Sequence, residues 1–371
     1  MVKVHVVGAG PCGSIAAISA LRNGHNVVIS EEHDITNNAS VCSGLFSTEG
    51  LQSLKQFINH KKYVINSIKG ADMYFGKEVF HVRTKTPVAY VCNRKEFDNA
   101  LIDNAESEGA KINYRERIKG NFHSNFIIGA DGPNSDVAAH FAFPRIKKYI
   151  CAIKAVVDYD WAAAGSSHST IKMHLSNNHF PGFFGWMIPH SKECIELGVG
   201  VQLPNSIKKA WRTLLGMYGV KASEVNATAD IIPICTRRKT AMENGNKKII
   251  LVGDAAGQVK ASTGGGVIFG GNCAAIAGQY IEAPLSYESE WRARFGADLA
   301  AHEMIRSYLS RFSDKHLAVL GKILTDLKIN DYLSAYGDMD RPTKMIGFGM
   351  ITHMITHAVG KKLFCINNKV R

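Results

Sequence analysis

The pattern of apolar and polar positions at the start of the chain predicts a strand, a turn, a helix and a second strand. Residues 2–7 (VKVHVV) form a largely apolar run typical of a buried strand, and residues 25–30 (HNVVIS) form another. Between them, residues 14–24 have the small, apolar spacing of a helix that ends at a glycine. Together these segments predict a βαβ unit at the N-terminus.

The rest of the chain mixes buried strands with alternating ones. Segments 63–92 and 150–235 contain short stretches that alternate between apolar and polar residues, which predicts antiparallel strands and a second sheet. Segments 125–135 and 247–257 begin as continuous apolar runs and end in glycine-bearing turns, as buried strands do. From about residue 288 onward the pattern is helical.

Because these patterns interleave, the sequence predicts three regions rather than two consecutive domains. The expected fold class is α/β, with a Rossmann-type nucleotide-binding domain interleaved with an antiparallel β-sheet substrate domain and followed by C-terminal helices. The expected boundaries are 1–62, 94–145 and 236–290 for the nucleotide-binding domain, 63–93 and 146–235 for the sheet domain, and 291–371 for the helical region.

Composition and charge narrow the class of protein. The chain has 371 residues, 46% of them hydrophobic and 20% charged, and no apolar run is long enough to span a membrane. We therefore expect a cytoplasmic protein. The formal net charge of +12 favours anionic partners such as acidic lipid headgroups or an acidic electron donor, although a plain solvated basic surface is the alternative. No nucleic-acid motif accompanies the charge, so nucleic acid is not an expected partner.

The eight cysteines do not suggest a metal site. None of them forms a CxxC pair, so the spacing excludes a zinc ribbon and an iron–sulfur ligand set. In a cytoplasmic chain the expected state of each is a reduced, mostly buried thiol.

The strongest chemical motif is Gly8-x-Gly10-x-x-Gly13. It follows the first predicted strand and opens the first predicted helix, and Glu31 stands 23 residues after Gly8, at the end of the second strand. In this context the glycines let a pyrophosphate approach the helix N-terminus, and the glutamate accepts hydrogen bonds from the adenosine ribose. The alternative is a glycine turn that holds no ligand.

Two further glycine-bearing turns follow buried strands. The first is IIGADGPNS, with Asp131 and Gly132. The second is residues 253–271 (GDAAGQVKASTGGGVIFGG), which begin with a glycine and Asp254 and carry almost no side-chain volume for long stretches. Side chains are excluded from such a segment either by a ligand against the backbone or by close packing between helices.

These three turns, in this order, resemble those of FAD-dependent flavoproteins of the class that includes aromatic hydroxylases and geranylgeranyl reductases. The resemblance implies FAD, not NAD, as the bound cofactor. It also implies that Asp254 hydrogen-bonds the ribitol and that the helix after residue 266 points its N-terminus at the flavin pyrimidine edge. The implied cofactor-binding residues are Gly8, Gly10, Pro11, Cys12, Gly13, Glu31, Glu32, Cys42, Gly44, Arg94, Ile118, Asp131, Gly132, Asp254, Gly264, Gly265, Gly266 and Val267.

Arg94 opens a predicted helix over residues 94–109, whose apolar face carries Phe97, Leu101 and Ile102. The resemblance implies that this arginine contacts the cofactor. The alternative is a salt bridge on the protein surface.

Residues 179–189 (HFPGFFGWMIP) resemble the PxxYxWxFP signature of geranylgeranyl reductases. Trp186 matches the signature, whereas Phe184 replaces its tyrosine and Ile188 its second aromatic residue. On a strand these three side chains share one face and form a flat apolar wall, although an ordinary core strand is the alternative. We expect a substrate slot lined by Phe183, Phe184, Trp186, Met187 and Ile188.

Cys42 stands eleven residues after Glu31, where geranylgeranyl reductases carry a cysteine beside the flavin. The resemblance implies a redox or proton role for it, with simple packing as the alternative, and implies that Gly44 lets the chain pass close to the cofactor. With Trp186 and Phe184, Cys42 completes the set of candidate catalytic residues.

The resemblance implies an enzyme that saturates C=C bonds of geranylgeranyl chains in a membrane lipid or its precursor, such as an archaeal ether lipid. Hydride would pass from N5 of reduced FAD to one alkene carbon, and a proton would reach the other. The expected partners are a prenylated lipid, an electron donor such as NAD(P)H, ferredoxin or another low-potential carrier, and the anionic membrane surface, against which residues 345–366 could lie. The alternatives are an aromatic monooxygenase, a flavoprotein that passes electrons to quinone, and a basic lipid-surface protein with vestigial cofactor turns.

Overall fold

The computed structural model describes residues 1–34, 42–159 and 167–345, and the chain divides into two compact units. Unit 1 comprises Met1–Ile65, Tyr90–Cys151 and Ala229–Glu303, and unit 2 comprises Asn66–Ala89, Ala152–Thr228 and the chain from Met304 onward. In this division the helices after residue 290 are shared between the two units. The separate helical region 291–371 stays a prediction.

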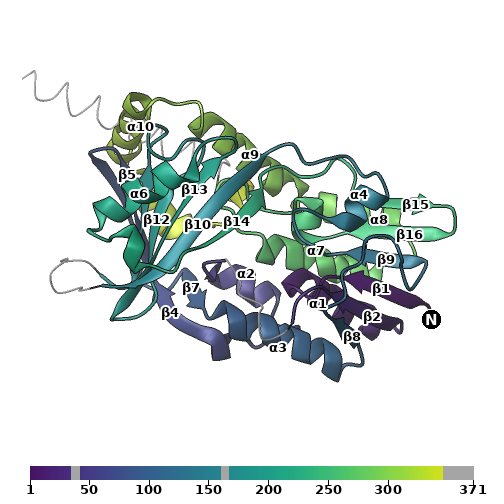
Figure 1. Cartoon of the computed structure of the whole chain (residues 1–371). Coiled ribbons are helices and arrows are strands. Elements are labelled where there is room, and N and C mark those ends of the chain that lie inside the picture. The colour runs from purple at the N-terminus through teal and green to yellow at the C-terminus, as the bar shows by residue number, and fades with distance from the viewer. Residues whose placement is uncertain (35–41, 160–166, 346–371) are drawn as a thin grey trace, which may run out of the picture. The chain divides into compact units, whose positions relative to one another are not determined.

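Unit 1 is built on a six-stranded sheet in the order β15-β16-β9-β1-β2-β8. Neighbouring strands are parallel except for β15, which runs antiparallel to β16, and Figure 1 shows β16, β9, β1 and β2 side by side. The strands are β1 (Lys3–Val7), β2 (Asn26–Glu31), β8 (Lys111–Tyr114), β9 (Phe126–Gly129), β15 (Ala241–Asn244) and β16 (Lys247–Leu251). The buried strands predicted within 2–7, 25–30, 125–135 and 247–257 are all present.

Both faces of this sheet are covered at its centre, which explains the consecutive apolar residues of its central strands. Val6, Ile128 and Ile250 belong to the core on one face, whereas Ile127 and Ile249 belong to a second core on the other. Successive side chains on a strand point to opposite faces, so a strand that is buried on both faces needs an apolar residue at every position.

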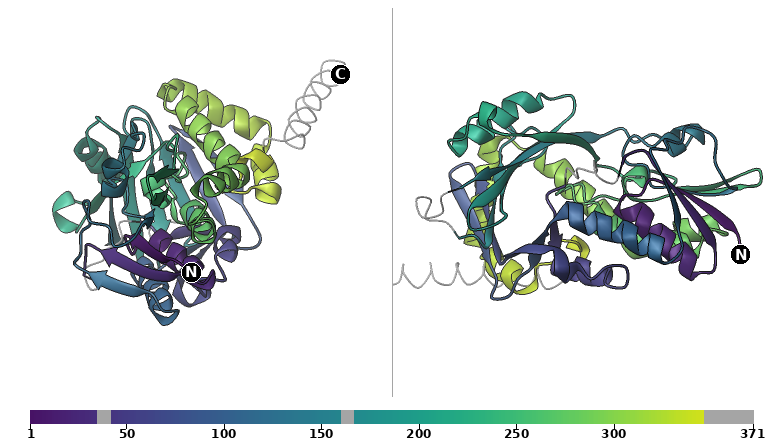
Figure 2. Two further views of the ribbon diagram at one scale, coloured as in Figure 1. Left: turned by 90° about the vertical axis from the view of Figure 1, so that its right-hand side faces the viewer. Right: turned by 60° about the horizontal axis from the view of Figure 1, so that its bottom comes forward.

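Helices and a small sheet complete unit 1. The helical segments are α1 (Pro11–Arg22), α2 (Thr48–Ser53), η2 (His60–Tyr63), α3 (Arg94–Ser107), α4 (Asp136–His140), η4 (Gly253–Ala256), α7 (Val267–Gln279), α8 (Pro284–Trp291), η5 (Arg292–Gly296) and α9 (Ala297–Leu309), the last of which continues into unit 2. The small sheet has the order β3-β7-β4, from β3 (Leu45–Ser47), β7 (Ala89–Cys92) and β4 (Val64–Ile68). Helix α1 packs between α3 and α7 (Figure 2).

The close approach of α1 and α7 depends on glycines. A Cβ at Gly278 would lie 2.5 Å from the Ala20 nitrogen and 2.5 Å from the Ser19 Cβ, and a Cβ at Gly271 would lie 3.0 Å from the Ile15 Cδ1. Distances under 3.0 Å are closer than atoms in contact can lie, so Gly278 must lack a side chain for the two helices to meet. Helix packing therefore accounts for the small residues in the body of α7.

Unit 2 is built on a seven-stranded sheet in the order β14-β10-β13-β12-β11-β5-β6. Its strands are β5 (Gly70–Phe75), β6 (Glu78–Arg83), β10 (Tyr149–Asp158), β11 (Thr170–Leu175), β12 (Gly185–Pro189), β13 (Cys194–Gln202) and β14 (Thr228–Pro233). The predicted second sheet is thus present. The pairing of β5 with β6 is antiparallel, but β5 runs parallel to β11, so the segment is not wholly antiparallel as its alternation suggested.

Helices cover both faces of the unit 2 sheet. Helix α6 (Ile207–Met217) packs on β13 and brings Leu214 against Gly185, while α10 (Asp314–Asp326) brings Gly321 against Phe75. The strand register places Phe75 on the same face as Trp186, and Gly185 on the opposite face. The remaining helical segments of this unit are η3 (Ala222–Glu224), α11 (Ile329–Tyr336) and α12 (Pro342–Met345).

Within the part of the chain that the structure describes, no helix combines the length and apolar composition needed to cross a membrane. The segment 345–366 could lie at a membrane surface or form a helix packed on the domain, and it lies outside the described residues except for its first residue.

Replacing Gly278 with alanine tests the helix packing. The added methyl group overlaps Ser19 and Ala20, so we expect Gly278→Ala to lower the free energy of unfolding by about 1–3 kcal/mol in urea denaturation. The control is Gly216→Ala in α6, where a Cβ meets no atom within 4 Å. That change should instead stabilise the chain by about 0.5–1 kcal/mol. Equal effects of the two changes would contradict the packing account.

Candidate functional site

Different structural features explain why each of the three positions in the first turn is a glycine. A Cβ at Gly8, which has a φ of +98°, would strike the Ala130 carbonyl oxygen, and a Cβ at Gly13 would strike the Gly8 carbonyl oxygen. A Cβ at Gly10 would meet no protein atom within 4 Å. Packing therefore requires Gly8 and Gly13, whereas the open space at Gly10 is the position predicted for the cofactor pyrophosphate.

Helix α1 begins directly after Gly10, with Pro11 in its first turn and no side chain capping it. Its first N–H groups are therefore available to an anion. Glu31, at the end of β2, is buried, and its Oε2 accepts a hydrogen bond from the Ala9 backbone nitrogen at 2.7 Å. The neighbouring Glu32 is exposed and lies 3.5 Å from Arg117. Glu31 thus holds the turn itself and is at the position predicted for ribose recognition.

The three glycine-bearing turns come together in unit 1. Ala130, which precedes Asp131, contacts Gly8. The Cys12 sulfur would lie 2.8 Å from a Cβ at Gly253 and 2.6 Å from a Cβ at Gly270. Segments about 120 residues apart in the sequence therefore surround one point. Burial raises the pKa of the Cys12 thiol, and the nearby Asp254 adds to this effect, so Cys12 is a neutral packing residue.

Asp254 lies against the N-terminus of α7. Its Oδ1 would be 2.8 Å from a Cβ at Gly266, the residue that precedes the helix, and no side chain caps that helix. The pKa of Asp254 is raised to about 6. Burial is the largest cause, Asp230 contributes in the same direction, and Arg94 opposes the rise. Among the described residues none donates a hydrogen bond to this half-buried carboxylate, so its acceptor oxygens are available for a ligand hydroxyl.

The turn that leads to α7 is folded by its own backbone. The Lys260 nitrogen donates to the Gly265 carbonyl at 3.0 Å, the Gly264 nitrogen donates to the Lys260 carbonyl at 2.7 Å, and Gly264 has a φ of +78°. These contacts leave the N–H groups at the start of α7, from Val267 onward, without partners inside the helix.

Asp131 is at the carboxyl end of β9, and its Oδ2 accepts a hydrogen bond from the Val137 nitrogen at 2.9 Å. Its other oxygen is buried with no partner among the described residues. Burial raises the pKa of Asp131, against the hydrogen bonds from Ser135 and Val137. The adjacent Gly132 has a φ of +77° and open space beside it. Ile118 is buried in the core on the α4 side of the sheet.

Arg94 forms a buried ion pair rather than the surface salt bridge that was the alternative. Its Nε and Nη2 donate to the two oxygens of Asp98 at 3.0 and 2.8 Å, and its guanidinium lies 5.7 Å from the centre of the Phe46 ring. Burial acts against the charge on Arg94, but Asp98 and Cys42 outweigh it and raise the Arg94 pKa. Its Nη1 is buried without a hydrogen-bond partner in the described chain, so a contact to the cofactor stays a prediction.

Cys42 is exposed and interacts with Arg94. Gly44, two residues later, has a φ of +68°, and a Cβ there would strike the Cys92 carbonyl oxygen. The absence of a side chain at Gly44 is thus explained by its pairing with β7. Its predicted closeness to the cofactor, and the redox or proton role of Cys42, stay predictions.

In unit 2 the aromatic segment forms the predicted wall. Phe183 and Phe184 stack with ring centres 4.2 Å apart, and Phe184 meets Trp186 edge to face at 5.8 Å. Trp186 lies directly over Gly198 of the neighbouring strand β13. Met187 was expected in the same wall, but it is buried on the opposite face beside Leu197, because successive strand residues alternate between faces.

Three functional candidates escaped the sequence reasoning: Asp98, Glu196 and Gly198. Asp98 follows Arg94 by four residues, a spacing that joins side chains on one helix face and could have indicated the ion pair. Glu196 is a charged residue inside the otherwise apolar strand β13, which is itself a signal of a buried partner. Gly198 has no sequence signal, because only the cross-strand register shows that it lies under Trp186.

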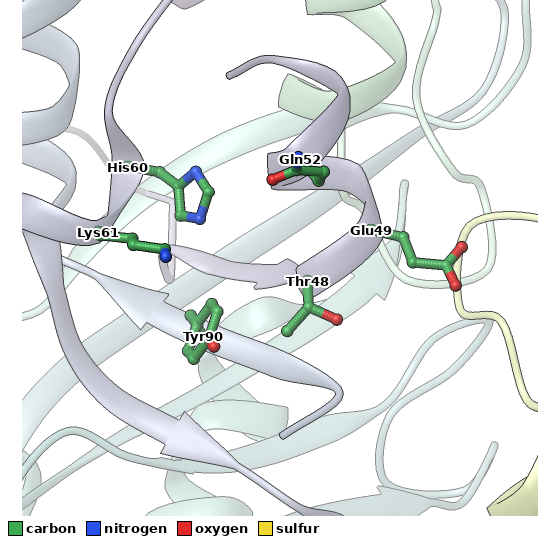
Figure 3. A pocket seen from close by; sticks show the side chains of 6 residues that line it. All are labelled: Thr48, Glu49, Gln52, His60, Lys61 and Tyr90. Carbon is green, nitrogen blue, oxygen red and sulfur yellow. The ribbon is translucent and has the colours of Figure 1, made fainter. Parts of the chain in front are cut away.

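Unit 1 also contains an open cavity of about 390 Å³ lined by Thr48, Glu49, Gln52, His60, Lys61 and Tyr90. His60 stacks on Tyr90 with ring centres 6.4 Å apart, and burial lowers the His60 pKa. Figure 3 shows the Glu49 carboxylate pointing away from His60, Lys61 and Tyr90. The polar side chains that line this cavity differ from the apolar slot expected for a prenyl chain.

The residues present fit FAD. Gly10 leaves room beside an uncapped helix start, which suits a pyrophosphate, and Asp254 offers an accessible carboxylate for ribitol hydroxyls. The start of α7 offers free N–H groups to the electron-rich edge of an isoalloxazine ring. The fold and this cradle define an FAD-binding oxidoreductase.

Comparisons with known proteins agree with the assignment of an FAD-binding protein. Residues 1–123 match the model of the FAD binding domain family. The digeranylgeranylglycerophospholipid reductase of Methanothrix thermoacetophila is 27% identical, covering 85% of this chain and 89% of that protein. The protein of the same name from Methanocaldococcus jannaschii is 26% identical, covering 86% of this chain and 90% of its own length.

A solved structure, a geranylgeranyl bacteriochlorophyll reductase-like protein from Thermoplasma acidophilum, superposes with a TM-score of 0.76 at 19% identity, over 87% of this chain and 91% of that one. The chain is therefore similar, over most of its length, to FAD-binding proteins of the geranylgeranyl reductase-like family. The resemblance noted in the sequence and the prediction of FAD are both confirmed.

Alanine substitutions at Gly10 and Gly13 separate cofactor binding from packing. Gly10→Ala adds a methyl group only to open space, so the FAD-free protein should keep its unfolding free energy to within about 1 kcal/mol. Its FAD affinity, measured by flavin fluorescence titration, should fall at least about tenfold. Gly13→Ala should lower the unfolding free energy by about 2 kcal/mol or more, because the methyl group meets the Gly8 carbonyl. Unchanged FAD affinity in Gly10→Ala would contradict the assignment.

The raised pKa of Asp254 predicts a pH-dependent stability. The folded, FAD-free chain holds the Asp254 proton more tightly than an unfolded aspartate with a pKa of 3.8 does, so stability falls as the pH rises from about 4 to about 6. Asp254→Asn removes this cost. We expect it to stabilise the FAD-free protein by on the order of 1–2 kcal/mol at pH 8, after allowance for solvent screening, and by about a third of that at pH 4.5. Thermal unfolding at the two pH values measures this, and a pH-independent gain would contradict it.

Proposed function

We propose that this protein uses FAD to saturate C=C bonds in the geranylgeranyl chains of a membrane lipid or lipid precursor. The observation that carries the proposal is the pair Trp186 and Ile188 on one face of β12, with Phe184 just before the strand against Trp186, in a segment that resembles the geranylgeranyl reductase signature. The names of the relatives from two methanogens, both digeranylgeranylglycerophospholipid reductases, support it.

An isolated prenyl double bond has no polar group for the protein to grip, so recognition depends on excluding water along the chain. Phe184 and Ile188 are buried and Trp186 is partly exposed, so Trp186 provides the apolar surface for a lipid chain and the other two side chains support it. Each buried methylene group contributes about 0.8 kcal/mol, so a long apolar face favours long chains over short ones. The apolar face thus provides affinity without any hydrogen bond.

When bound and reduced, FAD supplies the hydride for one alkene carbon. Residues of unit 1 would hold the cofactor: the uncapped start of α1 would bind the pyrophosphate, and Asp254 would accept hydrogen bonds from the ribitol. The N-terminus of α7 would stabilise negative charge on the flavin. The second alkene carbon takes a proton, for which Cys42 is the candidate donor.

The electron donor must be a low-potential carrier, such as NAD(P)H or ferredoxin. A net formal charge of +12 favours an acidic electron carrier and an anionic membrane surface, because complementary charge speeds encounter. It also suits substrates whose headgroups carry phosphate. The protein would then act at the cytoplasmic face of a membrane.

The proposal is tested under anaerobic conditions. The FAD-loaded protein is reduced with dithionite and mixed with an archaeal-type ether lipid that carries two geranylgeranyl chains, and the lipid product is analysed by mass spectrometry. We expect the product to gain two hydrogen atoms for each double bond reduced, while the flavin reoxidises. Trp186→Ala should lower kcat/KM by about tenfold or more without releasing FAD.

The same assay in air with NADPH separates the rival activities. A hydroxylated product from an aromatic substrate identifies a monooxygenase, and reduction of quinone with the lipid unchanged identifies an electron-transfer flavoprotein. A lipid of unchanged mass beside a flavin that stays reduced overturns the proposal. A colourless protein that binds lipid vesicles but no flavin overturns it as well.

A further inference from the structure

The side chain of Glu196 is a fully buried carboxylate in the middle of the unit 2 sheet, with 0% of its surface exposed. It is on β13, in the run CIELGVGVQ, where every other position from 195 to 201 is apolar or glycine. A buried ionised carboxylate costs several kcal/mol unless donors and an opposite charge surround it. The groups around the Glu196 carboxylate therefore explain how β13 accommodates a charged residue at this position.

Glu196 joins a cation to the indole of Trp186. The Lys154 Nζ lies 2.8 Å from Oε2, and the Trp186 Nε1–H donates to Oε1 at 2.9 Å. The His190 Nε2 lies 3.6 Å from Oε2. The two carboxylate oxygens thus have different nearest partners, and the ammonium of Lys154 balances the negative charge of the carboxylate.

The indole of Trp186 is held on three sides. Glu196 holds its polar edge, Phe184 meets it at an interplanar angle of 63°, and Gly198 lies beneath it, where any Cβ would overlap the Cε2 and Cζ2 atoms. A tryptophan lying flat on the sheet leaves the apolar face open, whereas a tryptophan standing upright would block it. The absence of a side chain at Gly198 and the acceptor at Glu196 therefore favour the same orientation.

We propose that Glu196 is a positioning residue, charged by Lys154, that holds Trp186 flat on Gly198 and so forms the rigid floor of the prenyl-binding face. This inference rests on the proposed function for the identity of the chain that lies on the floor, but the orientation of Trp186 is independent of it. Glu196 acts through Trp186 and does not itself touch the substrate.

The substitution Glu196→Gln tests this sharply. Lysine and the indole N–H can only donate hydrogen bonds, and a glutamine offers one acceptor and one donor group in place of two acceptors. Either the Lys154 ammonium or the Trp186 indole N–H must therefore face the NH₂ group of the glutamine. Because the ammonium competes more strongly for the remaining oxygen, the indole of Trp186 loses its partner. Glu193→Gln, on the exposed turn three residues earlier, is the matched control.

The orientation is read directly by ¹⁹F NMR of protein labelled with 5-fluorotryptophan. The chain has four tryptophans, and the resonance missing in Trp186→Phe identifies Trp186. We expect Glu196→Gln to shift and broaden this resonance and Glu193→Gln to leave it unchanged. Gly198→Ala, which pushes the ring off the sheet without altering charge, should also move it. An unmoved Trp186 resonance in Glu196→Gln overturns the proposal, whatever the effect of Gly198→Ala.

A double-mutant cycle with the lipid-reduction assay tests the consequence. Glu196→Gln should raise KM about tenfold for geranylgeranyl chains, with a smaller effect for geranyl chains and little change in kcat. In the Trp186→Phe background the same change should have almost no further effect, because the floor is already lost. A tenfold effect that persists without Trp186 assigns Glu196 a purely structural role and overturns the proposal.

The two proposals fail in distinguishable ways. If wild-type protein does not reduce prenyl chains, the proposed function fails, and the ¹⁹F resonance still decides whether Glu196 positions Trp186. If Glu196→Gln does not fold, the resonance of Gly198→Ala and its KM decide in its place.

Discussion

The cofactor site depends on the close approach of three stretches of backbone. Cys12 lies between Gly253 and Gly270. The turn that contains Asp254 lies against the start of α7, and the turn that contains Asp131 lies against Gly8. Most of these contacts leave no space for a Cβ, so they tolerate only glycine. Because α1 and α7 are held together in this way, their uncapped N-termini are fixed in place before any ligand binds, which lowers the entropic cost of binding.

Local patterns were sufficient to predict unit 1. A buried parallel strand is largely apolar, a glycine turn follows it, and Glu31 ends the next strand, so the βαβ unit and a dinucleotide site could be predicted from residue types, whereas FAD was implied by the family resemblance. The reason for the small residues in 253–271 became clear only from the structure, because helix packing and the cofactor site each account for a part of the segment. Packing on α1 explains Gly271, and helix packing continues to Gly278, whereas the free helix start near Gly266 suits the cofactor.

Unit 2 was harder to predict, because its residues are brought together by strand pairing. The wall of Phe184 and Trp186 could be predicted from alternation, and the same rule excludes Met187, which the expected slot had included. The partner of Trp186 lies on another strand, Glu196 on β13, and Glu196 in turn pairs with Lys154 on β10. No spacing in the sequence indicates which residues of different strands face one another, so this network could not be derived before the register was known.

The central claim is that all three glycine-bearing turns hold one FAD. Hydrogen–deuterium exchange of the FAD-free and FAD-loaded protein tests it most directly. The account predicts that one FAD per chain slows exchange in residues 8–13, 131–132 and 264–267 together, while the exposed strand β6 is unaffected. Protection of only the first of these segments, or exchange that FAD does not change, would contradict the account.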